Sequence, residues 1–304
     1  TRRSSDLPAN REIVEVVPHS YSLDGQENIK DPLGMTGTRL EINANVVSAL
    51  APHLHNLQKS AELAKVDAHT IVPSVLAGAR AVLNEQQIEN GVAVVDMGGA
   101  TTSVAVLEEG DLQYVGVIPI GGTNITNDLA IGLKTDPSIA EEVKLKHASA
   151  MPRGENSGIS VKDGEEILSF NSSDIDEIVD ARLEEIFDLV QHELKKAGRA
   201  GKLPSGVVLV GGAASMKHMT EYAKEKLGLA VRIGKPKGFG GVSDNVEQPE
   251  YAAVVGLMLI DTENGTNNRG NSRPSGRKMD SAAAKNSLKK ASGVLSNFLG
   301  RFKV

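Results

Sequence analysis

One segment of the chain combines residue types that suit phosphate chemistry. It places Asp96, Gly98 and Gly99 ahead of Thr101 and Thr102, between two apolar runs. Glycines let a backbone approach a phosphate closely, and consecutive N–H groups can bind an anion. A carboxylate beside such a turn is typical of a Mg²⁺ site, because hard cations prefer oxygen ligands. The pattern predicts a phosphate-binding β-hairpin in which Asp96 holds Mg²⁺ through water, and an ordinary exposed hairpin turn is the alternative.

A second apolar strand, predicted at 207–210, also ends in a pair of glycines. Gly211 and Gly212 follow it directly, and Ala213 comes next. Backbone without side chains leaves a flat surface for an adenosine, and the helix predicted at 216–227 begins nearby. A tight strand-to-helix turn without a ligand is the alternative interpretation.

Hydrophobic periodicity predicts the elements that position these two turns. Three antiparallel strands precede the first helix after the hairpin, which is unlike a Rossmann fold, where the glycine loop follows one strand directly. The helices at 74–83 and 250–260 are rich in small residues, which favours close packing, for the first one against a neighbouring domain. We expect strands within 12–47 and at 70–72, 112–120, 166–170 and 231–233, and further helices at 48–64, 124–133, 137–147 and 174–197.

Length and composition limit the classes of protein. The 304 residues suffice for two domains, and the absence of Cys excludes disulfides and thiol chemistry. The chain has no apolar run of about 18 residues, and its polar start lacks the apolar region of a signal peptide. Because the sequence begins at Thr1 without an initiator Met, we expect it to be a fragment.

Positive charge gathers at the C-terminal end. From Asn267 onward there are nine Lys or Arg residues and one acid, Asp280, whereas the rest of the chain holds 24 basic and 38 acidic residues. Residues 261–286 are rich in Asn, Gly, Ser and Arg without periodicity, which predicts a flexible linker. The basic residues lack the aromatic stacking platforms of nucleic-acid grooves, so we do not expect a nucleic-acid partner.

Residues 287–304 regain a helical pattern in which an apolar stripe is flanked by basic residues. Such a helix after a linker is typical of a segment that lies on an anionic membrane surface. A helix that docks on its own core, or on a partner protein, is the alternative. The predicted membrane-binding residues are Leu288, Leu295, Phe298, Leu299, Phe302, Lys289, Lys290, Arg301 and Lys303.

The order of these motifs resembles the actin, hexokinase and chaperone ATPase superfamily. There the hairpin at Asp96 is the second phosphate loop, Gly211–Ala214 is the adenosine loop, and the helix at 252–256 is a connecting helix. Glu141 and Lys144 share one helix face and match the pair that contacts the ribose and adenine. The resemblance implies an α/β, actin-like (ribonuclease H-like) fold that binds ATP and Mg²⁺.

Several segments narrow the resemblance to one family within the superfamily. They are 28–37 with 39–41, 117–122 with 125–128, 140–146, 231–234 and the basic C-terminus. In these segments the chain resembles the FtsA family of bacterial cell-division proteins. The resemblance implies an ATP-binding protein that forms actin-like filaments with itself, holds the FtsZ ring to the membrane and helps assemble the septal division machinery. It implies a peripheral location on the cytoplasmic face of the cell membrane, at the division site, with FtsZ and other division proteins as partners.

The resemblance also implies a domain organisation. The family's first phosphate loop has no counterpart in this sequence, so we expect an incomplete first half and a complete second half. The implied parts are a partial inserted subdomain 1C at 1–66, the end of subdomain 1A with a connecting helix at 67–88, subdomain 2A at 89–133 and 174–260, subdomain 2B at 134–173, the linker at 261–286 and the membrane-targeting helix at 287–304.

Three residues depart from the family pattern. Val72 stands where many relatives carry a Glu that could orient attacking water, and Ala100 and Ser103 replace a Gly and an Asp. We therefore expect ATP hydrolysis to be slow at most and assign no catalytic residue, whereas binding needs only the phosphate cradle. A pilus-assembly adaptor and a small-molecule kinase of the same superfamily remain open as alternatives.

Overall fold

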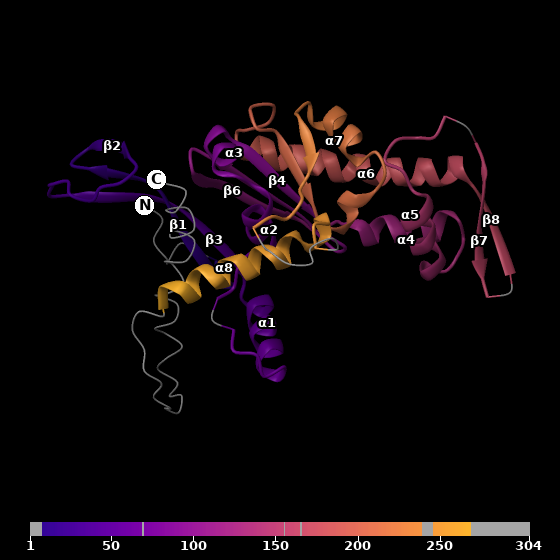
Figure 1. Cartoon of the computed structure of the whole chain (residues 1–304), viewed down its shortest axis with the longest axis horizontal. Helices are drawn as coiled ribbons and strands as arrows, with labels where there is room; N and C mark the ends of the chain where they lie inside the picture. The colour runs from indigo at the N-terminus through magenta and orange to yellow at the C-terminus, as the bar shows by residue number, and fades with distance from the viewer. Residues whose placement is uncertain (1–7, 69, 155, 165, 239–245, 269–304) are drawn as a thin grey trace. The chain divides into compact units, whose positions relative to one another are not determined.

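The computed structural model describes residues 8–68, 70–154, 156–164, 166–238 and 246–268 (Figure 1). The chain divides into two compact units. The described residues of the first unit lie within 1–73, 110–113 and 260–304, and those of the second lie within 74–109 and 114–259. The predicted membrane-targeting helix at 287–304 lies outside the described residues. None of the helices in the described ranges combines the length and apolar character needed to cross a bilayer.

The first unit contains a three-stranded antiparallel sheet with strand order β2-β1-β3. Its strands are β1 (Arg11–Leu23), β2 (Gln26–Ile29) and β3 (Leu40–Leu50). Asp24 and Gly25 connect the first two with φ angles of 51° and 87°, as a two-residue hairpin turn requires. Helix α1 (Ala51–Leu63) follows directly. The helix predicted at 48–64 therefore begins three residues too early, because β3 stays paired with β1 as far as Leu50.

The second unit is built on a five-stranded sheet with strand order β10-β9-β4-β5-β6. The central strand β4 pairs antiparallel with β5 and parallel with β9. This arrangement confirms the hairpin predicted around Asp96. The strands are β4 (Val92–Met97), β5 (Thr102–Glu108), β6 (Asp111–Ile118), β9 (Val207–Val210) and β10 (Val231–Ile233).

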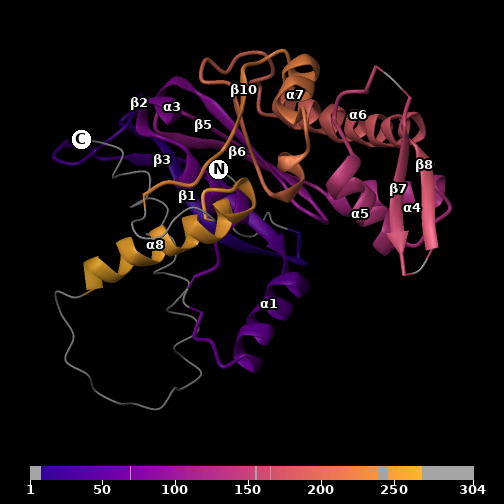
Figure 2. The same cartoon turned by 45° about the vertical axis from the view of Figure 1, so that its right-hand side comes forward.

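Both faces of this sheet are buried, which explains why its central strands read as unbroken apolar runs. On one face, Val95 and Met97 join the core formed with the long helix α6 (Ser172–Lys196). On the other face, Val210 lies next to Gly78 of helix α2 (Ser74–Val82). Helix α7 (Met219–Leu227) packs against α6 and β10 (Figure 2).

The helices that follow the sheet strands match the sequence expectations closely. They are α4 (Gly122–Gly132), α5 (Pro137–His147) and α6. Two short elements were not expected, namely helix α3 (Glu85–Asn90) and strand β7 (Gly158–Asp163), which pairs with β8 (Glu166–Asn171). The strand expected at 70–72 is absent, and α7 is preceded by a 3-10 turn at Gly212–Ser215 that shortens it.

The two helices rich in small residues pack against each other. A side chain at Gly256 of α8 (Ala252–Asn268) would collide with the carbonyl oxygen of Ala77 on α2, and Gly78 lies near Ala252. The close packing is thus confirmed. Helix α2, however, packs against a helix segment of its own unit and not against a neighbouring domain as predicted. Helix α8 continues to Asn268, so the predicted start of the flexible linker at 261 is wrong.

The contact-based division also differs from the implied subdomains. Residues 110–113 and 260, which the resemblance assigns to subdomain 2A, belong to the first unit. Residues 74–88, which the resemblance assigns to the end of subdomain 1A, belong to the same compact unit as 89–109. The cause is the packing of α2 and α3 on the sheet strands β4 and β5. The other subdomain boundaries stay predictions.

Candidate functional site

The turn between β4 and β5 is held closed by backbone hydrogen bonds. Gly98 N–H donates to Thr101 O at 2.9 Å across the turn. The start of α4 docks on the same turn, because Gly122 N–H donates to Gly98 O at 2.9 Å and Thr123 N–H donates to Gly99 O at 2.8 Å. Gly99 and Thr101 remain exposed at the tip. The turn is therefore a rigid backbone surface, as a phosphate cradle requires.

Asp96 lies on β4 at the base of this turn and is half-buried. Its Oδ2 accepts a hydrogen bond from Ser74 Oγ at 2.9 Å. Burial raises the pKa of the Asp96 carboxyl above its ordinary value, and the hydrogen bond from Ser74 opposes that rise. A partly desolvated carboxylate gains from a nearby cation, so Asp96 fits a position beside a Mg²⁺ ion that it would hold through water. No group of three or more His, Cys, Asp or Glu side chains in the described ranges could hold a metal alone, so other ligands would come from water and phosphate.

The second double-glycine turn lies beside the first. Gly211 has φ +88°, and a side chain there would come within 2.5 Å of Met97 O and 2.7 Å of Asp96 Oδ1. Its N–H donates to Pro249 O at 2.9 Å. A side chain at Gly212, by contrast, would meet no atom of the described residues within 4 Å. The turn thus touches Asp96 on one side and is open on the other.

Helices α4 and α5 contribute a polar network. Lys144 Nζ lies 2.6 Å from Glu141 Oε2, 2.7 Å from Thr126 Oγ1 and 3.1 Å from Gly122 O. Thr126 Oγ1 also contacts Glu141 Oε2 at short range. A Cβ at Gly122 would lie 3.3 Å from Ala213 Cβ and 3.8 Å from Lys144 Nζ, so this glycine joins the network to the second turn.

The structure therefore brings most of the predicted ligand-binding residues together within the second unit. Lys144 is one exception, because its three N–H donors are taken by Gly122 O, Thr126 Oγ1 and Glu141 Oε2. Thr102 is the other. Its side chain is fully buried, and its hydroxyl donates to Ile120 O at 2.8 Å. The hydroxyl thus fastens β5 to the segment before α4, and the geometry gives no support to the prediction that it binds phosphate. The predicted membrane-binding residues lie outside the described ranges.

Three residues of the site were not on the predicted list, namely Ser74, Gly122 and Thr126. Gly122 carries a sequence signal, because it belongs to a third double glycine that precedes a helix. A Ser at the start of a helix and a Thr inside one carry no signal, since either residue is common at such positions without a ligand.

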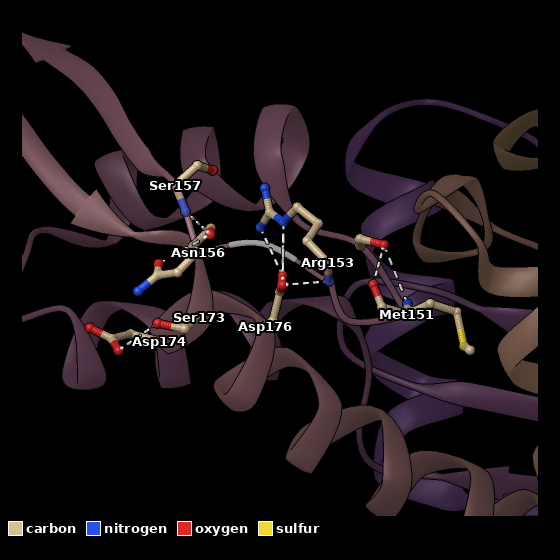
Figure 3. Close-up of polar contacts among 9 residues, drawn as sticks. Met151, Arg153, Asn156, Ser157, Ser173, Asp174 and Asp176 are labelled. Atoms are coloured by element: carbon tan, nitrogen blue, oxygen red, sulfur yellow. Dashed lines mark hydrogen bonds and ion pairs between the residues drawn. The ribbon is translucent and has the colours of Figure 1, made fainter.

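A second polar cluster lies between α5 and β7, at the start of α6 (Figure 3). Arg153 donates from its backbone N–H to Asp176 Oδ2 and from its guanidinium to Asp176 Oδ1, both at 2.8 Å. Ser157 N–H donates to Ser172 Oγ at 2.8 Å, and Ser172 N–H donates to Ser157 O at 2.9 Å. These bonds fasten the segment before β7 to α6, so we interpret this cluster as structural.

Comparison with known families gives matches over most of the chain. A family model described as cell division protein FtsA matches residues 93–256, and one described as the SHS2 domain inserted in FtsA matches residues 1–48. The FtsA protein of Pseudomonas aeruginosa is 35% identical to this chain, over 83% of this chain and 62% of the relative. The FtsA protein of Bacillus subtilis is also 35% identical, over 85% of this chain and 58% of the relative. The chain thus spans about three fifths of the length of these relatives.

Solved structures show the same fold at lower sequence identity. The MreB5 protein of Spiroplasma citri bound to ADP has a TM-score of 0.59 and 17% identity, over 73% of this chain and 69% of that one. A PilM–PilN type IV pilus biogenesis complex gives a TM-score of 0.61 and 17% identity, over 83% and 67%. These likenesses confirm the predicted actin-like fold.

Proposed function

The chain belongs to the FtsA family of cell division proteins, and we propose that it is an ATP-binding tether between FtsZ and the cytoplasmic membrane. In this proposal it forms actin-like filaments with itself and helps assemble the septal division machinery. The observation that carries the nucleotide part is the convergence of the turns that follow β4 and β9 with the Glu141–Lys144 network, joined at Gly122.

Each part of the site has a proposed task. The turn of Gly98 and Gly99 with the exposed Thr101 would form the phosphate cradle, in which the Gly98 N–H closes the turn onto Thr101 O and is not itself a donor to phosphate. Gly211–Ala213 would lie against the adenosine. Asp96 would hold a water of the Mg²⁺ ion, which would neutralise phosphate charge when bound. The similar MreB5 structures carry ADP or AMPPNP, which supports a nucleotide as the ligand.

Rapid hydrolysis is not part of the proposal. Ser103, which stands where relatives carry an Asp, is only 7% exposed on β5, so it offers little surface to a water molecule. Phosphoryl transfer depends on placing the attacking water, whereas binding depends on the cradle. We therefore propose a protein that responds to bound ATP and turns it over slowly at most.

The tether part rests on the C-terminal sequence pattern. An apolar stripe between basic residues suits the boundary of an anionic membrane, and each basic residue there contributes about 1 kcal/mol of attraction. Residues 287–304 carry Lys289, Lys290, Arg301 and Lys303 and contain no acidic residue. This segment would hold the protein, and FtsZ bound to it, on the cytoplasmic face of the membrane at the division site.

Liposome flotation tests the tether directly. The intact protein, a variant that lacks 287–304, and a variant with Lys289→Glu and Lys290→Glu are mixed with anionic liposomes, with and without purified FtsZ. We expect the intact protein to float and to carry FtsZ, and both variants to stay below. If the intact protein floats but added FtsZ stays below, FtsZ is contradicted as the partner. No flotation at all would contradict the membrane role and favour the pilus adaptor or the kinase.

A further inference from the structure

The ammonium group of Lys144 is fully occupied inside the protein. An ammonium has three N–H donors. Gly122 O, Thr126 Oγ1 and Glu141 Oε2 lie within 3.1 Å of Nζ, and the side chain is 12% exposed. No donor of Lys144 is left for a ligand in this arrangement. Lys144 is thus placed to support its neighbours.

Thr126 connects the two helices of this network. It lies on α4, whereas Glu141 and Lys144 lie on α5. Its hydroxyl accepts from Lys144 and donates to Glu141 Oε2, which is much closer than the other acceptor, Gly122 O, at 3.3 Å. The residue is 5% exposed, so it does not itself face a ligand.

Glu141 is the exposed member of the network. Both of its hydrogen bonds end on Oε2, and Oε1 has no partner among the residues that the structure describes. The side chain is 42% exposed. Burial acts to raise the pKa of Glu141, but the hydrogen bonds from Lys144 and Thr126 and the charge of Lys144 bring it below its ordinary value. Oε1 is therefore an ionised acceptor that is open to a ligand.

We propose that Thr126 is a positioning residue for sugar recognition, which together with Lys144 fixes Glu141 Oε2 so that Oε1 accepts a hydrogen bond from a ribose hydroxyl. The inference rests on the proposed ATP site and adds which residue positions the carboxylate there. A fixed acceptor binds better than a mobile one, because its rotamer freedom is lost before the ligand arrives. A site built around a substrate hydroxyl also rejects the analogue that lacks it, since the acceptor is then unpaired.

The test compares Thr126→Val with Thr126→Ser in the full chain. Valine has nearly the shape of threonine without the hydroxyl, and serine keeps the hydroxyl. Dissociation constants are measured for Mg-ATP, Mg-2′-deoxyATP and Mg-3′-deoxyATP. We expect the unaltered protein to prefer ATP about tenfold over at least one deoxy analogue, as a hydrogen bond to a charged acceptor would give.

In Thr126→Val that preference should fall to about one, and Thr126→Ser should restore it. Thr220→Val is the matched control, because it removes a hydroxyl that donates to a carboxylate at 2.8 Å on the exposed surface of α7. We expect this control to leave all three constants unchanged. Thermal unfolding of each variant shows whether it is folded.

The outcomes separate this inference from the proposed function. If the unaltered protein binds ATP and both deoxy analogues equally, or if Thr126→Val keeps the preference for ATP, sugar recognition by this network is overturned while ATP binding stands. A Thr126→Ser protein that behaves like Thr126→Val overturns the role of the hydroxyl. If the unaltered protein binds none of the three nucleotides, both proposals are overturned.

Discussion

The two double-glycine turns of the second unit look alike in the sequence and differ in the structure. In the turn after β4, neither glycine has a positive φ, and the closest approaches of an added Cβ would be 3.0 Å to Thr101 O and 3.3 Å to Thr123 Oγ1. In the turn after β9, Gly211 has φ +88° and touches backbone, whereas Gly212 has open space around it. The same dipeptide is thus required by the fold at one position and free of protein contacts at another.

This difference separates structural from functional glycines. Gly211 must lack a side chain because of Met97 and Asp96, whatever ligand is bound. Gly212 has no such reason within the described residues, and the proposed passage of the adenosine over it would supply one. Substitutions at the two neighbours should therefore give opposite patterns of stability and binding.

Gly211→Ala should have the largest effect. The φ of +88° strains any residue with a side chain, and the new Cβ would press on Met97 O at 2.5 Å, which belongs to backbone that cannot rotate away. We expect a loss of about 3 kcal/mol or more in the free energy of unfolding, measured by urea denaturation. A matched Gly212→Ala variant should stay within about 0.5 kcal/mol of the unaltered protein. If Gly211→Ala and Gly212→Ala lose equal amounts of unfolding free energy, the distinction between a structural and a functional glycine is wrong.

Gly212→Val should show the reverse pattern. No described atom lies within 4 Å of its added Cβ, so we expect thermal unfolding without a ligand to change little. A branched side chain on the proposed adenosine surface should weaken ATP binding more than tenfold, measured by calorimetry in the complete protein. A folded variant with unchanged affinity would show that nothing binds across Gly212, and the second turn would then be purely structural.

Sequence patterns could predict much of the second unit because its elements bury apolar residues in a regular order. The helix at 137–147 and the strand at 207–210 have the predicted bounds, since most of their apolar residues are buried as the pattern requires. The strand at 231–233 also has the predicted bounds, although its three residues are only partly buried. The start of α1 at Ala51 is harder to predict, because Ser48 to Leu50 suit a strand and a helix equally. The pairing of β3 with β1 decides between the two.

The site was predictable only in part, for a related reason. Glycine pairs and a carboxylate leave a local signature, so the turns at Asp96 and Gly211 could be found. The use of a hydroxyl depends on neighbours that are distant in the sequence. Thr102 has Ile120 O within reach and turns inward, and Thr126 joins two residues of another helix. Only the fold supplies those partners.

Asp96→Asn should separate stability from binding within the first turn. The raised pKa of Asp96 means that its ionised form costs the folded protein stability, a cost that is absent below the ordinary pKa and complete above the raised one. The ligand-free variant should therefore unfold at a higher temperature than the unaltered protein at pH 7, and this difference should shrink toward about pH 4.

The same variant should bind Mg-ATP about tenfold more weakly, because an amide is a poorer ligand for the ion's water. Ser74→Ala is the paired control. It removes a hydrogen bond that favours the carboxylate, so the unfolding temperature at pH 7 should fall. If the unfolding temperature at pH 7 falls in both variants, Asp96 stabilises the fold. If Asp96→Asn binds Mg-ATP with unchanged affinity, Asp96 is not part of the nucleotide site.

Gly99→Ala should change stability much less than Gly211→Ala and completes the comparison between the turns. The added Cβ would meet Thr123 Oγ1 at 3.3 Å, which is the end of a side chain that can rotate, and Gly99 is exposed with an ordinary φ. We expect a loss below about 1 kcal/mol in the free energy of unfolding. Urea denaturation beside Gly211→Ala measures the contrast directly. A loss as large as that of Gly211→Ala would mean that the first turn is as tightly constrained as the second, and its glycines would then need no ligand to explain them.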